Sequence, residues 1–271
     1  MVQYIIIILV SFGASVIGAV CGIGGGVIIK PVLDATGIIP VDTISFLSGC
    51  TVLSMSVISV IKNIRKLKKK PEDGVSGKGF DSRTATALAL GGIAGGLLGK
   101  SIYQNVLSRM AGTNVIGAVQ AAVLLAVTIG TLMYTIWKEH IRTLQITSST
   151  ICVIIGVLLG MMSAFLGIGG GPINLVVLFF FFSMGTKQAA VYSLYIIMFS
   201  QLSSLISSIV NQNVPEFHSV ILIIMVFCGI AGGLAGARIN RKIKGAVVDR
   251  LFITLLIIII LVNIYNIFKY I

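Results

Sequence analysis

Long apolar stretches alternate with short polar ones along almost the whole chain. This pattern predicts ten helical elements, at about 3–21, 26–38, 42–61, 84–104, 114–137, 146–166, 171–184, 187–210, 217–238 and 249–268. A helix that crosses a bilayer needs about 20 mostly apolar residues. The second and seventh elements, of about 13 residues each, are too short for this, and we expect half-helices or re-entrant segments there.

The composition favours a membrane protein over a soluble one. Of the 271 residues, 56% are hydrophobic and only 10% are charged. So few ionisable groups cannot cover the surface of a soluble globule of this size. We therefore predict an all-α polytopic membrane protein that forms one integral membrane domain in a lipid bilayer.

The positive charges collect in two connections between apolar segments. The formal net charge is +12, and 62–83 holds eight Lys and Arg residues while 238–250 holds five. Basic connections of this kind face the cytoplasm in multi-pass proteins, so we predict that both of these do. A nucleic-acid surface would need a folded platform with basic and aromatic side chains together, and we predict no nucleic-acid partner.

The two halves of the chain resemble each other. The sequence GIGGG at 22–26 recurs at 167–171, and the offset of 145 residues holds for about forty residues without gaps. A second glycine-rich block, which we interpret as a helix-packing face, occurs at 92–99 and again at 229–236. We predict two membrane repeats, 1–139 and 140–271, with five elements each. If all five elements of each half cross the membrane, the odd number of crossings inverts the second repeat and places both termini outside. If the two short elements are re-entrant, the chain crosses only eight times and this argument about the orientation of the second repeat changes.

The repeated glycines are candidate substrate-binding residues: Gly22, Gly24, Gly25, Gly26, Gly167, Gly169, Gly170 and Gly171. Hydrocarbon offers no hydrogen-bond partners, so unwound backbone at membrane depth occurs only where it is buried in protein or lines a cavity. The free N–H groups at the start of a half-helix bind anions, and Pro31 and Pro172 suit the first turn of each restarting helix. Close helix packing is the alternative, but two symmetric breaks favour a transport site.

Polar side chains near the breaks complete the candidate site. We assign Ser48, Ser193 and Gln201 to it, since they belong to polar stripes on the third and eighth elements; interhelical hydrogen bonding is the alternative role. Lys30 and Asn174 each follow a break closely, and we interpret the neutral Asn174 as the counterpart of Lys30. Lys30 either contacts an anion, pairs with Asp34 or extends to the membrane interface.

No sequence pattern of an enzyme is present. The nucleotide-binding pattern GxxxxGK[ST] does not occur, and no Ser/His/Asp set or carboxylate pair stands out. His140 and His218 have no partner residue at metal-ligand spacing. The four cysteines also lack such spacing, and we expect the cysteines to be small core residues. We predict no catalytic residues, no metal and no cofactor.

The ordered motifs resemble those of the TauE/SafE sulfite exporter family. They are the duplicated GxGGG followed closely by proline, the segment 190–194 (AVYSL) and the late glycine-rich segment 229–238. The resemblance extends over nearly the whole chain. It implies a permease of the bacterial or archaeal cell (inner) membrane for sulfite, organosulfonates or related small anions. The segment 46–49 (FLSG) and Lys30 depart from the family pattern, which leaves the substrate open.

The resulting hypothesis is a secondary transporter that exports a small anionic solute through a midplane site at the two breaks. Two alternatives remain: a permease for a different small solute, and a membrane assembly or sensor protein that transports nothing. The coupling ion, the stoichiometry and the oligomeric state are not encoded in any pattern described above.

Overall fold

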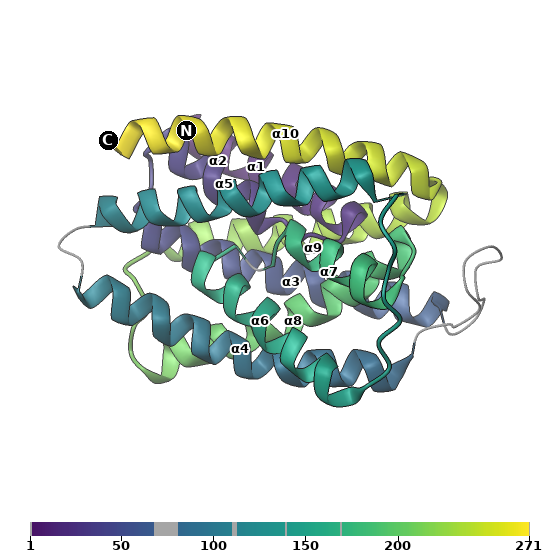
Figure 1. Cartoon of the computed structure of the whole chain (residues 1–271). Coiled ribbons are helices and arrows are strands. Elements are labelled where there is room, and N and C mark those ends of the chain that lie inside the picture. The colour runs from purple at the N-terminus through teal and green to yellow at the C-terminus, as the bar shows by residue number, and fades with distance from the viewer. Residues whose placement is uncertain (1, 68–80, 110–112, 139, 169, 271) are drawn as a thin grey trace.

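The computed structural model describes residues 2–67, 81–109, 113–138, 140–168 and 170–270 as a bundle of helices (Figure 1). This part of the chain contains ten helices and no strand: α1 (Val2–Cys21), α2 (Gly26–Thr36), α3 (Val41–Leu67), α4 (Ser82–Arg109), α5 (Thr113–Trp137), α6 (Ser149–Leu166), α7 (Pro172–Phe182), α8 (Thr186–Val210), α9 (Ser219–Lys242) and α10 (Gly245–Tyr270). All ten predicted elements are confirmed, although α3 runs further into the basic connection than we expected.

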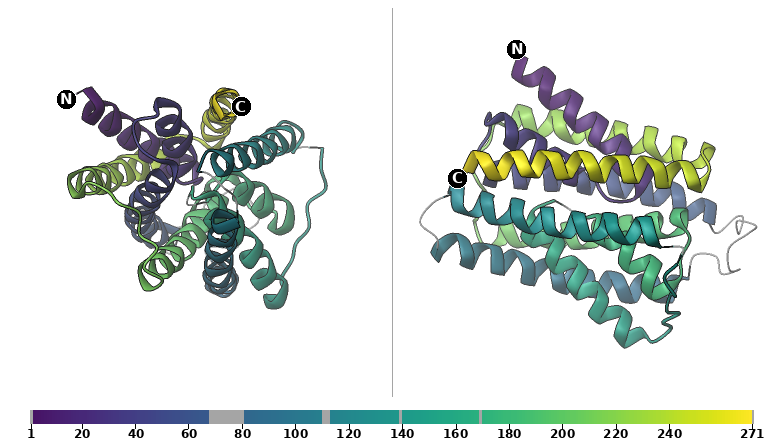
Figure 2. Two further views of the ribbon diagram at one scale, coloured as in Figure 1. Left: turned by 90° about the vertical axis from the view of Figure 1, so that its left-hand side faces the viewer. Right: turned by 45° about the horizontal axis from the view of Figure 1, so that its top comes forward.

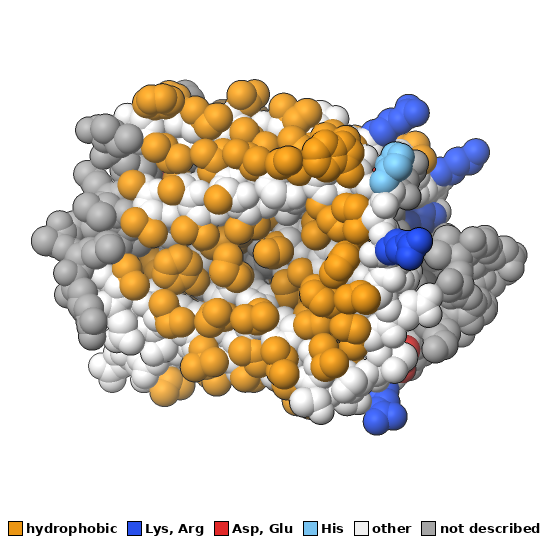
Figure 3. Space-filling model, viewed as in Figure 1, with side chains coloured by type: hydrophobic (Ala, Val, Ile, Leu, Met, Phe, Trp, Pro, Cys, Tyr) orange, Lys and Arg blue, Asp and Glu red, His pale blue; other side chains and the backbone are white. Residues whose placement is uncertain are grey.

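Eight of the described helices are long and apolar enough to cross a membrane, all except α2 and α7. Apolar side chains cover the visible face of the molecule, and Lys and Arg side chains gather at its right-hand end (Figure 3). The prediction of an all-α polytopic membrane protein is therefore confirmed. Helices α2 and α7 have 11 residues each, about 16 Å, and each covers only about half of a hydrocarbon core roughly 30 Å thick.

Contacts between helix termini define two ends of the bundle. At one end, which we call the basic end, contacts join residues at or near the starts of α4, α6, α8 and α10: Asp81 with Tyr192, Arg83 with Ser149, and Thr186 with Asp249. At the other end, which we call the terminal end, the Thr43 hydroxyl donates to the Glu216 carbonyl (3.1 Å) and joins α3 to the start of α9. Both chain termini lie at the terminal end (Figures 1 and 2).

Helices of the two predicted repeats interleave. Helix α4 packs against α6 and α8, and its equivalent α9 packs against α1 and α3. Two further contacts join equivalent helices to each other, α3 to α8 and α5 to α10. Helices α3 and α9 begin at the terminal end, whereas α8 and α4 begin at the basic end. This is the arrangement that an inverted repeat requires; the inversion and the boundary between 139 and 140 stay predictions.

The second glycine-rich block forms packing faces, as predicted. On α4, a Cβ added to Gly95 would lie 2.1 Å from the carbonyl oxygen of Val157 on α6. On α9, a Cβ added to Gly236 would lie 2.5 Å from the carbonyl oxygen of Val16 on α1. Small residues thus let the backbones of these helix pairs approach closely, which is how membrane helices associate when lipid is as apolar as the side chains.

Candidate functional site

The first break unwinds the chain between α1 and α2. Gly22 (φ 81°) and Gly24 (φ 79°) lie in the left-handed region, which glycine adopts at no steric cost. Residues 22–26 are buried, and the N–H groups of 23–26 donate to no backbone carbonyl of the described residues. Because a buried N–H without an acceptor costs free energy, we expect a ligand or water to supply the missing acceptors.

The second break separates α6 from α7. Gly167 (φ 64°) ends α6, and Gly170 (φ 117°) is left-handed as well. Gly171 precedes Pro172, which begins α7, so the prediction of a proline in the first turn is confirmed there. For the first break it is wrong, because Pro31 lies inside α2. The predicted site residue Gly169 lies outside the described residues.

The two breaks contact each other. A Cβ added to Gly26 would lie 2.0 Å from the carbonyl oxygen of Ile168 and 2.9 Å from Oγ of Ser48. Only a glycine allows the segments to approach this closely. The Ser48 hydroxyl at the junction is buried and has no hydrogen-bond partner among the described residues. Two segments separated by more than half of the chain thus form one polar junction.

Further buried polar groups near the two breaks form no hydrogen bond with another described residue. Both polar atoms of the Asn174 side chain are buried and form no hydrogen bond with another described residue. Its Nδ2 would lie 3.6 Å from a Cβ at Gly170. The buried Ser193 hydroxyl on α8 also lacks a partner in the described part of the chain. Ser15, which sequence reasoning missed, packs against Gly25 of the first break, and its hydroxyl has no partner within the described part of the chain. Buried polar groups of this kind indicate a missing water, ion or ligand.

Lys30 has a different environment from the one that anion binding requires. Its ammonium donates to Oε1 of Gln120 and to the carbonyl oxygen of Leu166, both at 2.6 Å. Nε2 of Gln120 donates to the Phe165 carbonyl (2.7 Å). These donors satisfy carbonyls in the last turn of α6, at the negative end of its dipole. At the offset of 145, Lys30 aligns with Leu175 and not with Asn174. The geometry favours a structural role for this lysine.

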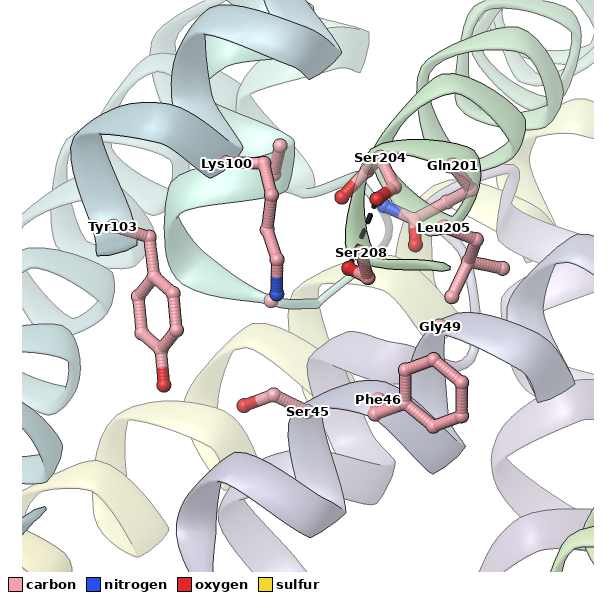
Figure 4. A pocket seen from close by; sticks show the side chains of 11 residues that line it. Ser45, Phe46, Gly49, Lys100, Tyr103, Gln201, Ser204, Leu205 and Ser208 are labelled. Atoms are coloured by element: carbon pink, nitrogen blue, oxygen red, sulfur yellow. Dashed lines mark hydrogen bonds between the residues drawn. The ribbon is translucent and has the colours of Figure 1, made fainter. Parts of the chain in front are cut away.

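A polar pocket adjoins the second break (Figure 4). Its lining consists of Ser45, Phe46, Gly49, Lys100, Tyr103, Ala164, Gly167, Gln201, Ser204, Leu205 and Ser208. It unites two predicted site residues, Gly167 and Gln201, and Nε2 of Gln201 lies 3.4 Å from the Ser163 hydroxyl. The cavity measures about 20 Å³, room for about one water molecule. The described conformation is therefore closed around the pocket.

Lys100 and Tyr103 were not among the predicted site residues. Lys100 is the one charged residue in the apolar segment 84–104. An ionisable residue in such a segment is a functional candidate by default, so the sequence carried a usable signal. The glycines beside it led to an assignment of this segment to packing alone. Ser45 and Ser208, which also line the pocket, have no comparable signal, because single serines are common in membrane helices.

A larger cavity, which we call the vestibule, opens at the terminal end. It measures about 560 Å³ and is lined by Gln3, Tyr4, Ile7, Ile38, Ile39, Pro40, Thr43, Leu47, Glu216, Phe217, His218 and Ile221. The ring of Phe217 stacks on that of Phe46, with centroids 5.5 Å apart. Because Phe46 lines the polar pocket and Phe217 lines the vestibule, this aromatic pair lies between the two cavities.

The cysteines and histidines do not assemble into a metal centre within the described residues. Cys21 and Cys152 are buried and Cys50 and Cys228 are half-buried, and all four are free thiols. They fit the predicted role of small core residues. His218 lines the vestibule, away from the breaks.

Comparison with known proteins adds a family. Residues 7–262 match the family described as "Sulfite exporter TauE/SafE". The "Probable membrane transporter protein YunE" of Bacillus subtilis is 23% identical over 258 residues, which cover 89% of this chain and 90% of that protein. The "Probable membrane transporter protein MJ0441" of Methanocaldococcus jannaschii is 24% identical over 251 residues, with coverage of 88% and 87%. No solved structure matches significantly.

Proposed function

We propose, because the chain belongs to the sulfite exporter TauE/SafE family, that it carries a small sulfur-containing anion, sulfite or an organosulfonate, out of the cell. Membership of this family makes the chain a multi-pass membrane transporter. The proposal adds the substrate class, the direction and the site. The site is the junction of the two breaks together with the polar pocket beside it.

One observation carries this proposal: hydrogen-bond donors that have no acceptor among the described residues lie at the two breaks. They are the N–H groups of 23–26 and the side chains of Ser48, Asn174 and Ser193. An oxyanion accepts hydrogen bonds from N–H, hydroxyl and amide groups at once. A metal cation would instead need several oxygen ligands directed at one point. The donor-rich break therefore supports an anion as the solute.

The membrane potential suffices to drive export. Under the positive-inside rule the basic end faces the cytoplasm of a bacterial or archaeal cell. A divalent anion that leaves a negative interior gains about 4.6 kcal/mol per 100 mV, since each charge contributes about 2.3 kcal/mol. This corresponds to about three decades of concentration ratio. No nucleotide hydrolysis is needed to move such a solute.

Transport by alternating access requires each end of the bundle to open in turn. The terminal end is held closed by the Phe46 and Phe217 stack (5.5 Å) beside the hydrogen bond from Thr43 to Glu216. The basic end is held closed by Tyr192. Its hydroxyl accepts a hydrogen bond from the N–H of Asp81, just before α4 (2.6 Å). Separation of either set would enlarge a pocket that now has room for about one water molecule.

Flux in proteoliposomes tests the proposal. Purified protein is reconstituted, and uptake of labelled sulfite and of methanesulfonate is compared with that of phosphate, chloride and potassium under an imposed membrane potential. We expect saturable, potential-driven flux of a sulfur anion that empty liposomes do not show. Preference for an unrelated ion would favour a permease for another solute. If no solute moves and none raises the thermal stability, a role in membrane assembly or sensing replaces the proposal.

A further inference from the structure

We propose that Lys100 binds the charge of the transported anion, in the polar pocket beside the second break. This inference rests on the proposed function and adds to it a specific side chain. It also adds an asymmetry between the two repeats, since only one of them supplies this cation.

The side chain of Lys100 extends from α4 into the pocket (Figure 4). Its ammonium lies 5.1 Å from the ring centroid of Tyr103, one turn further along the same helix. Across the pocket, α8 presents Gln201 and Ser204, and α3 presents Ser45. A cation, a phenol, an amide and two hydroxyls thus surround one small space. These are the groups that bind a compact oxyanion in a water-poor site.

The Lys100 ammonium has no acceptor of its own. Within the described residues it forms no hydrogen bond and no ion pair. Asp42, at the start of α3, interacts with it electrostatically but does not form an ion pair with it. Lys100 is half-buried, and the three N–H donors of its ammonium can bind an anion that enters the pocket. Lys30 differs, because two acceptors at 2.6 Å bind its ammonium.

The second repeat has no equivalent cation. At the offset of 137 that relates the two glycine-rich blocks, Lys100 aligns with Ala237 and Tyr103 aligns with Asn240. Ala237 is fully buried. The Asn240 side chain donates to the Val20 carbonyl (2.5 Å) and so caps α1. The place equivalent to the pocket is thus occupied by a helix-capping contact. We therefore infer one anion site per chain, at the pocket that Lys100 lines.

A purely structural Lys100 would make different predictions. The ammonium near Tyr103 is within the range of a cation–π contact, and removal of a structural contact lowers the stability of the protein without anion. Removal of a charge that lacks an acceptor leaves that stability unchanged or raises it. Two measurements together separate anion binding from a structural role: the melting temperature, and KM, the substrate concentration at half-maximal flux.

The experiment compares Lys100→Gln and Lys100→Arg with wild type in the sulfite flux assay. Lys242→Gln is the matched control, because it removes one positive charge from an exposed position at the end of α9. We expect Lys100→Gln to raise KM for sulfite by tenfold to about a hundredfold, the effect of one hydrogen bond to a charged group. Lys100→Arg should restore KM to within a few fold, and Lys242→Gln should match wild type.

If wild type transports sulfite, either of two results would overturn the inference about Lys100. One is a KM for Lys100→Gln within twofold of wild type. The other is a lowered maximal rate and melting temperature at an unchanged KM, which would make Lys100 structural. If wild type neither binds nor transports any anion tested, the proposed function fails and the anion role of Lys100 fails with it. The three results are distinguishable in one set of measurements.

Discussion

The contact between the two breaks makes Gly26→Ala the most informative single substitution. A Cβ at this position would lie 2.0 Å from the carbonyl oxygen of Ile168, which belongs to the other break and cannot rotate away. Ordinary contact begins near 3.4 Å, so the two segments would have to separate by about 1.4 Å. Gly26 has helical backbone angles at the start of α2, so the effect is steric and involves no left-handed strain.

The expected cost follows from overpacking of a close-packed interior. Such substitutions cost about 1–3 kcal/mol, and more when backbone must move. The helix-propensity gain of alanine over glycine, about 1 kcal/mol in a helix interior, is smaller at the first residue of a helix. For a protein of this size the net loss lowers the melting temperature by roughly 2–12 °C. The shift should be visible without any substrate.

Two glycines provide matched controls in the thermal unfolding assay of detergent-purified protein. Gly171 is equivalent to Gly26 at the offset of 145, but a Cβ there would meet only Cδ1 of Ile168 at 3.5 Å. Gly130 on α5 has nothing within 4 Å. Alanine at either position should shift the melting temperature by no more than about 2 °C. If Gly26→Ala melts together with these controls, the two breaks do not contact each other and the reasoning is refuted.

Three other variants test separate parts of the structure. Lys30→Met removes the donor to the last α6 carbonyls and should cost about 1–3 kcal/mol; an unchanged melting temperature would contradict the capping role. Ser48→Ala combined with Ser193→Ala removes two buried hydroxyls without partners, so stability without anion should hold or rise by about 1 kcal/mol while stabilisation by sulfite is lost. A destabilised variant that still responds to sulfite would assign these serines to structure. Tyr192→Phe removes the two hydrogen bonds between its hydroxyl and the Asp81 backbone at the start of α4, and hydrogen exchange there should accelerate about tenfold; unchanged exchange would show that these bonds do not close the basic end.

Much of the fold was predictable because a bilayer restricts the possibilities. Each crossing needs a long apolar run, and glycines mark where a run is interrupted. The two short helices were therefore expected before any coordinates. The prediction for Pro31 was wrong because α2 already begins at Gly26, within the glycine break and five residues before the proline. The membrane packing of α2 tolerates a proline in its interior, where soluble helices usually break.

The candidate site was predictable only in part. The repeat pointed to the glycines, to Ser48 and to Ser193, because equivalent positions are visible in one sequence. The contact between Gly26 and Ile168 joins residues far apart in the chain, and no local pattern encodes it. The same holds for Lys30, whose acceptor on Leu166 lies in the other repeat. Lys100 was detectable as a lone charge, but its approach to α8 was not.

Binding of labelled sulfite to purified protein, measured by equilibrium dialysis, tests most directly whether the donors at the breaks serve an anion. Wild type is compared with the Ser48→Ala, Ser193→Ala double variant, at protein concentrations where both remain folded. We predict saturable binding of about one sulfite per chain in wild type and none in the double variant. Sulfite that fails to saturate, or that binds both proteins equally, would contradict the account.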